Sequence, residues 1–201
     1  MKSDIIQLEN NTDVLEKILE ETEKASKYEG LNTKQIIRER LLAEELINML
    51  PELLEYCNGN FWVTTEGKKI SLHISVTLDD IFSADREKLM ELSTSKTNAS
   101  AKGIVNKIRA ACEMMLMDYV SLSADVPTDF YSMGMMGEPF NYYISSWSLD
   151  MYRQALEKED DELAWDELEK SIIANIADDV IVGIIGKNVD IIVVKDWEDK
   201  A

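Results

Sequence analysis

A carboxylate and an amide lie one helical turn apart in "LLAEELINML", residues 41–50. At about 100° per residue, Glu44 and Asn48 share one stripe of a helix with Ile37 and Leu41. The other faces of this segment are also largely apolar, which is typical of a buried helix. We therefore expect Glu44 and Asn48 either to have partners in the core or to line a cavity. The i and i+4 spacing places the carboxylate and the amide on one helical face.

The chain holds one histidine and two cysteines, which limits other kinds of chemistry. His73 lies in the alternating stretch "KISLHISV", and we interpret it as an ordinary strand residue. Cys57 and Cys112 are far apart in apolar helical context, so with one histidine they leave no zinc-binding constellation. Serine–histidine or cysteine–histidine catalysis would need His73, and no GxSxG motif accompanies it.

Charge and composition exclude several classes of protein. The 201 residues carry 39 acidic against 21 basic side chains, a formal net charge of −18, and 45% are hydrophobic. This is enough for one domain with its own core. The negative field disfavours nucleic acid and anionic membranes, although backbone N–H groups can still hold a small anion. Because no stretch resembles a secretory signal or a membrane span, we expect a cytoplasmic protein.

Hydrophobic periodicity switches between helix and strand in a fixed order along the chain. Two helices come first, and Pro51 is expected to interrupt or kink the second of them. Two alternating runs joined at Glu66-Gly67 then predict an antiparallel hairpin, and two β-rich runs around "GKN" predict a second one. The expected elements are helices at 11–30 and 32–50, a hairpin at 60–80, a short helix at 83–95, a flexible segment at 96–103, a helix from 101, an irregular insertion at 121–147, helices within 148–177 and a hairpin at 178–197.

Helices segregated from antiparallel strands predict an α+β two-layer sandwich, with helices on a mostly antiparallel (mixed) sheet. We expect a single domain over residues 1–201, with the helix at 33–50 packed on a sheet that contains the strands around 60–77 and 179–195.

In this order the chain resembles the histidine-kinase-like ATPase superfamily, or Bergerat fold, and most of all its anti-sigma-factor serine kinase branch. The segment from Glu44 to Asn48 is similar to that family's Asn box, Glu-x-x-x-Asn. "SAKGIVNKIRAA", residues 100–111, is similar to the later glycine box, and the last hairpin resembles the one that closes the sandwich. The first glycine box, Asp-x-Gly-x-Gly, is degenerate, because "LDDIFSADREK" holds no glycine.

The resemblance implies a site for ATP and Mg²⁺. Asn48 would hold Mg²⁺ against the triphosphate, and Glu44 would be the catalytic residue that polarises water or the attacking group. Asp79 or Asp80 would accept a hydrogen bond from the adenine amino group. The other residues implied to bind the nucleotide are Lys96 and Lys102 in a polar lid and Gly103 at the helix start.

We accordingly expect an ATP-binding regulatory module with weak or no catalysis. The alternatives are a nucleotide-free protein-interaction domain and an active serine kinase or ATPase. A regulatory protein partner and a homodimer are both compatible with this class, and the methionine- and aromatic-rich "YSMGMMGEPFNYY" is a candidate partner surface.

Overall fold

The computed structural model describes residues 1–8, 12–53, 59–77, 146–159, 165, 168, 171–185 and 188–198. The short helix expected at 83–95, the flexible segment at 96–103, the helix from 101 and most of the insertion at 121–147 lie outside these residues. The described elements are β1 (Ile6–Leu8), α1 (Thr12–Tyr28), α2 (Thr33–Leu53), β2 (Gly59–Glu66), β3 (Lys69–Thr77), β4 (Ser146–Ser148), α6 (Leu149–Glu159), α8 (Ile172–Ile176), β5 (Asp179–Ile185) and β6 (Asn188–Asp196).

The strands form one six-stranded sheet in the order β1-β2-β3-β6-β5-β4, and every pair is antiparallel. β2 and β3 make the first predicted hairpin, whose turn contains Gly67 at φ 58°. β5 and β6 make the second, and β6 pairs with β3 along nine residues, from Lys69–Asp196 to Thr77–Asn188. The α+β class and the presence of both hairpins in one sheet are therefore confirmed, and no described strand pair is parallel.

Both long helices begin or end at the signals that the sequence contains. Asn32 caps α2, because its Oδ1 accepts from Gln35 N–H at 3.1 Å while Gln35 Oε1 accepts from Asn32 N–H at 2.9 Å. Gly30 follows α1 with a φ of 71°, and Leu31 N–H donates to Ser26 O at 3.1 Å. The expected interruption at Pro51 is wrong, since α2 continues through it to Leu53.

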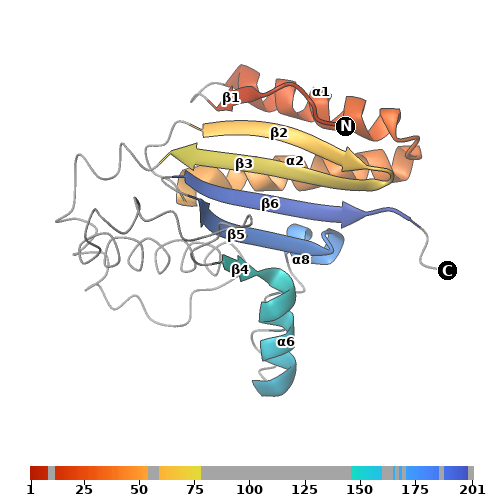
Figure 1. Cartoon of the computed structure of the whole chain (residues 1–201). Helices are drawn as coiled ribbons and strands as arrows, with labels where there is room; N and C mark the ends of the chain where they lie inside the picture. The colour runs from red at the N-terminus through yellow and green to blue at the C-terminus, as the bar shows by residue number, and fades with distance from the viewer. Residues whose placement is uncertain are drawn as a thin grey trace, which may run out of the picture.

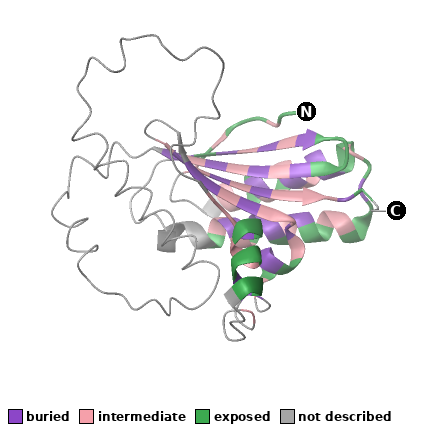
Figure 2. Cartoon of the chain, turned by 60° about the horizontal axis from the view of Figure 1, so that its bottom comes forward, coloured by how far each residue is buried: buried purple, intermediate pink, exposed green. Residues whose placement is uncertain are grey.

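The hydrophobic core lies between the sheet and the helices α1 and α2; in Figure 1, α2 lies behind the sheet and α1 along its β1–β2 edge. The two helices bury Ile18, Ala25, Leu42, Ala43 and Leu46 in the same cluster as alternate residues of four strands. Figure 2 shows this alternation as buried and half-buried bands along the strands. The strand residues that face the helices are Phe61, Val63, Ile70, Leu72, Ile74, Val76, Val180, Val182, Val189, Ile191 and Val193. The helix predicted at 33–50 thus packs on the predicted sheet.

Gly59 opens β2 at a crowded point between β1 and β3. A Cβ added there would lie 2.9 Å from the carbonyl oxygen of Ser75 and 3.1 Å from Val76 Cγ2. We expect Gly59→Ala to lower the free energy of unfolding in urea by about 1–3 kcal/mol, as overpacking does. The control is Gly67→Asn, since a Cβ at Gly67 meets only Glu198 Oε1 at 3.6 Å and asparagine tolerates its positive φ. Equal losses in the two variants would contradict the expected crowding.

Candidate functional site

The polar pair that suggested chemistry lies on the outward-facing side of α2. Glu44 and Asn48 are both exposed, and the apolar members of their stripe are exposed as well, Ile37 at 54% and Leu41 at 39%. The expectation of a helix buried all round is therefore wrong, and neither polar residue has a place in the core. The physical reason is that α2 buries only the opposite stripe, where Leu42 and Leu46 pack on the sheet.

Glu44 and Asn48 lie in the C-terminal half of α2. The C-terminus of α2 lies at one end of the sheet. In Figure 1, the end of α2, the start of β2 and the end of β3 all lie at that end of the molecule. Gly59 at the start of β2 pairs with Val76 near the end of β3, which fixes this arrangement. The structure thus places Glu44 and Asn48 together on one exposed face of α2.

The other predicted nucleotide-binding residues lie outside the described residues. They are Asp79, Asp80, Lys96, Lys102 and Gly103. In the sequence, Asp79 follows Thr77, the last residue of β3, by two positions.

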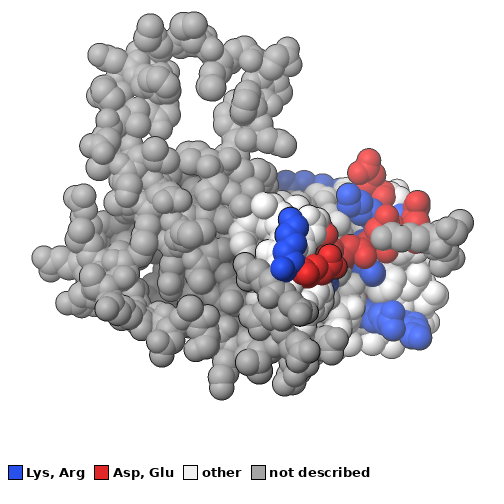
Figure 3. All heavy atoms as spheres, turned by 90° about the horizontal axis from the view of Figure 1, so that it is seen from below, with Lys and Arg blue, Asp and Glu red and all other residues white. Residues whose placement is uncertain are grey.

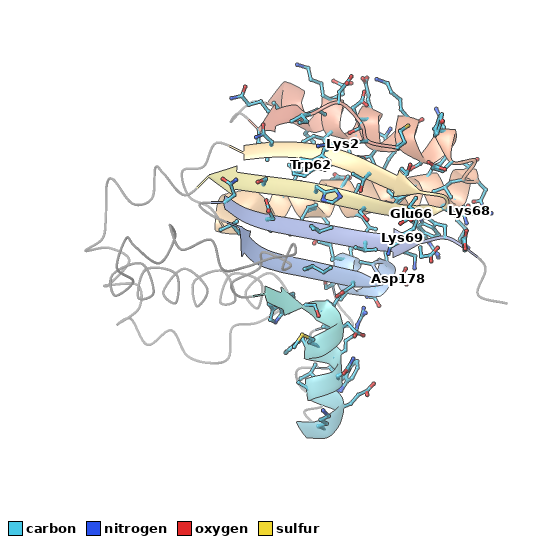
Figure 4. All side chains as sticks on the ribbon, viewed as in Figure 1. Lys2, Trp62, Glu66, Lys68, Lys69 and Asp178 are labelled. Atoms are coloured by element: carbon cyan, nitrogen blue, oxygen red, sulfur yellow. The ribbon has the colours of Figure 1, made fainter. Side chains whose placement is uncertain are left out.

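His73 is a strand residue, as predicted. It lies on β3 on the face opposite to α1 and α2, stacked on Trp62 with ring centroids 5.0 Å apart and an interplanar angle of 6°. Its Nε2 is 2.7 Å from Thr64 Oγ1, within hydrogen-bond distance. Burial, together with the charge of Lys2, lowers the pKa of His73 to about 4. Figure 4 shows Lys2 next to Trp62 on this face, where its Nζ is 4.8 Å from the ring centroid. A histidine that stays neutral down to this pH is a weak general base.

One functional candidate was missed at the level of sequence, the buried carboxylate of Glu39. Its side chain is 0% exposed, Trp197 Nε1 donates a hydrogen bond to its Oε1, and burial raises its pKa to about 7. The signal that could have found it is the spacing of Glu39 to Leu42 and Leu46, which places it on the buried stripe of α2.

On the side of the molecule that Figure 3 shows, the described charges are mixed in sign. Seen from below in Figure 3, Lys and Arg side chains lie beside Asp and Glu instead of forming a patch of one sign. Within the described ranges, no group of three or more His, Cys, Asp or Glu side chains could hold a metal ion. No helix in the same ranges is both long and apolar enough to cross a bilayer.

Comparison of the chain with protein-family models, with curated proteins and with solved structures found no match. The case for a function therefore rests on the side chains and the topology described above.

Proposed function

We propose that this chain is an ATP-binding regulatory module of the Bergerat type, which holds Mg²⁺–ATP at the C-terminal half of α2. The observation that supports it is the joint exposure of Glu44 and Asn48 on one face of α2, near the end of β3 that leads to Asp79 and Asp80. The topology is in keeping with this proposal. Both hairpins belong to one sheet, and α1 and α2 cover a single face of it.

The donor at hand fits a magnesium ion that is shared with a nucleotide. Mg²⁺ prefers oxygen ligands, keeps several waters, and commonly takes only one or two protein oxygens together with phosphates. Asn48 offers an exposed amide oxygen, so it can reach such an ion from the helix surface. When bound, the ion would offset the negative charge of the phosphates. This matters in a chain whose formal net charge is −18.

Weak or absent turnover is part of the proposal. Phosphoryl transfer requires rigid positioning and preorganised charge around the γ-phosphate. Glu44 is exposed, so water solvates its carboxylate, and the segment after β3 lacks the glycines that would let backbone N–H groups approach phosphate. We therefore expect binding without efficient hydrolysis.

Calorimetric titration with Mg-ATP and Mg-ADP tests the proposal. We expect Asn48→Ala to weaken Mg-ATP binding by about 1.5–3 kcal/mol, the range for one hydrogen bond to a charged group, and Glu44→Ala to change affinity little. The matched control is Asn60→Ala, which removes an exposed asparagine of β2 on the face of the sheet opposite to α2. Absence of binding to the wild type, or equal losses in Asn48→Ala and Asn60→Ala, would reject the site.

Product analysis on the same samples separates binding from catalysis. Rapid ADP release or serine phosphorylation by the wild type, lost in Glu44→Ala, would identify an active kinase or ATPase and contradict the expectation of slow turnover.

A second candidate function, a nucleotide-free interaction domain, is favoured by the exposed apolar side chains of Ile37 and Leu41. Lys34 and Arg38 are exposed beside them at helical spacing, so this part of α2 offers two apolar anchors flanked by cations. Its charge is complementary to an acidic amphipathic segment of a partner protein. Binding of such a segment by a chain that fails to bind Mg-ATP would favour this function over the first.

A further inference from the structure

Glu39 on α2 and Trp197 after β6 make a buried contact between parts of the chain that are 158 positions apart. Glu39 is fully buried and Trp197 is 8% exposed. Trp197 Nε1 donates to Glu39 Oε1, and Trp197 N–H donates to the carbonyl oxygen of Lys68 at 3.1 Å. The tryptophan is thus held both by α2 and by the turn between β2 and β3.

The carboxyl group of Glu39 is only half satisfied by this contact. Its Oε2 is buried without a hydrogen-bond partner among the described residues. An ionised carboxylate normally accepts several hydrogen bonds, and leaving a buried oxygen of a charged group unpaired costs more than leaving one of a neutral acid. Desolvation by burial is the largest influence on Glu39 and raises its pKa to about 7; the hydrogen bond from Trp197 acts in the opposite direction.

The two charged groups that act on Glu39, Lys195 of β6 and Asp178 before β5, are already paired with each other. Lys195 Nζ lies 3.1 Å from Asp178 Oδ1 and 5.1 Å from the centroid of the Trp197 ring. Asp178 Oδ2 also accepts from Asp196 N–H at 2.7 Å. The charge of Lys195 lowers the pKa of Glu39 and that of Asp178 raises it, so the pair gives Glu39 little net compensation. Figure 4 shows Lys68 and Asp178 near the end of the sheet where β6 ends.

Two further cations of the described part are also engaged elsewhere. Arg40, the neighbour of Glu39 in sequence, pairs with Glu23 of α1. Arg153 of α6 donates to backbone carbonyl oxygens at the end of α8, among them Asp178 O at 2.9 Å. In the described part of the chain, Glu39 therefore has no cation of its own.

An ionised Glu39 gains its missing hydrogen bonds most easily from water. The two segments that make the contact, α2 and the residues after β6, differ in how easily they move apart to admit water. α2 is fixed by Leu42 and Leu46 in the core. Trp197 belongs to no strand and follows the last residue of β6. We propose that Glu39 and Trp197 form a pH-sensitive latch that fastens the chain after β6 to α2 while Glu39 is protonated, and that ionisation of Glu39 releases Trp197. This device is independent of nucleotide binding, because it lies at the N-terminal half of α2.

The indole N–H resonances of the four tryptophans provide the test. In a proton–nitrogen correlation spectrum, with the Trp197 signal assigned from Trp197→Phe, we expect the wild-type Trp197 indole signal to move from a closed to an open position with a midpoint near pH 7. In Glu39→Gln, which cannot ionise, the signal should keep its closed position throughout. Glu45→Gln, which removes a half-exposed carboxylate of the same helix, should behave as the wild type.

Two results would overturn the latch. One is a Trp197 signal that does not change in the wild type, or that changes equally in Glu39→Gln. The other is obtained without any variant, by following the carboxyl carbon of Glu39 in the labelled wild-type protein. A midpoint near the ordinary 4.5, in place of about 7, would mean that the buried contact does not hold the proton.

Discussion

Phe61→Ala should lower the free energy of unfolding by about 3–5 kcal/mol, the usual cost of deleting a large buried side chain. Phe61 is fully buried in the middle of the core, on β2 between Ile6 of β1 and Ile74 of β3. Its ring faces the helix layer, where Ile18 of α1 belongs to the same cluster. Since domains are stable by only about 5–15 kcal/mol, this single change would remove a large share of the total. Urea unfolding followed by circular dichroism measures it.

Asn60 provides the matched control, because neighbouring residues of a strand point to opposite faces. Asn60 is exposed, so Asn60→Ala should change the free energy of unfolding by less than about 0.5 kcal/mol. A shift of β2 by one residue would exchange the two faces. A large loss in Asn60→Ala with a small one in Phe61→Ala would therefore show that the register of β2 differs from the one described.

The two hairpins could be predicted from sequence because each strand buries one face only. Alternation in β2 and β3 marks the buried residues directly, and Gly67 supplies the positive φ of the turn. The neighbours of each hairpin could not be predicted in the same way. β1 and β4 have three residues each, too few for a period, and the pairing of β3 with β6 joins segments more than one hundred positions apart.

The same reasoning was less successful on α2, for a physical reason. A helix with apolar residues on every side contains no signal for which side meets the sheet. The apolar pattern predicts a buried helix, but Ile37 and Leu41 are exposed, whereas Glu39, a charged residue, is fully buried. The spacing of Glu44 and Asn48 did predict their common face correctly, because that depends only on helix geometry. Whether Asp79, Asp80 and the lid residues meet them stays a prediction.

The pH dependence of stability should reveal two groups, the buried Glu39 and the half-buried His73, whose effects oppose each other. Burial raises the pKa of Glu39 to about 7, so the folded state binds its proton more tightly than the unfolded state does. The resulting stability is fully present below about pH 4.5 and is lost as the pH rises to about 7. It amounts to about 3 kcal/mol, since one pKa unit corresponds to about 1.4 kcal/mol.

His73 acts with the opposite sign. Burial lowers its pKa to about 4, so the folded state favours the neutral ring. Its contribution is present above about pH 6.5 and is lost as the pH falls through about 4; because the ring is partly exposed, solvent screening limits it to about 1–2 kcal/mol. Between these limits the two groups partly cancel, and the wild type should show a shallower profile than Glu39 alone would produce.

Single variants should separate the two contributions. Relative to Glu39→Gln, the wild type should lose about 3 kcal/mol of unfolding free energy between about pH 4.5 and pH 8, because only the wild type can ionise there. Relative to His73→Gln, it should instead gain about 1–2 kcal/mol between about pH 4 and pH 7. Urea unfolding at matched pH values measures both differences, and subtracting the wild-type profile removes the effects of all other titrating groups. A Glu39→Gln profile parallel to that of the wild type would mean that Glu39 ionises as readily in the folded chain as in the unfolded one, and a parallel His73→Gln profile would mean the same for the protonation of His73.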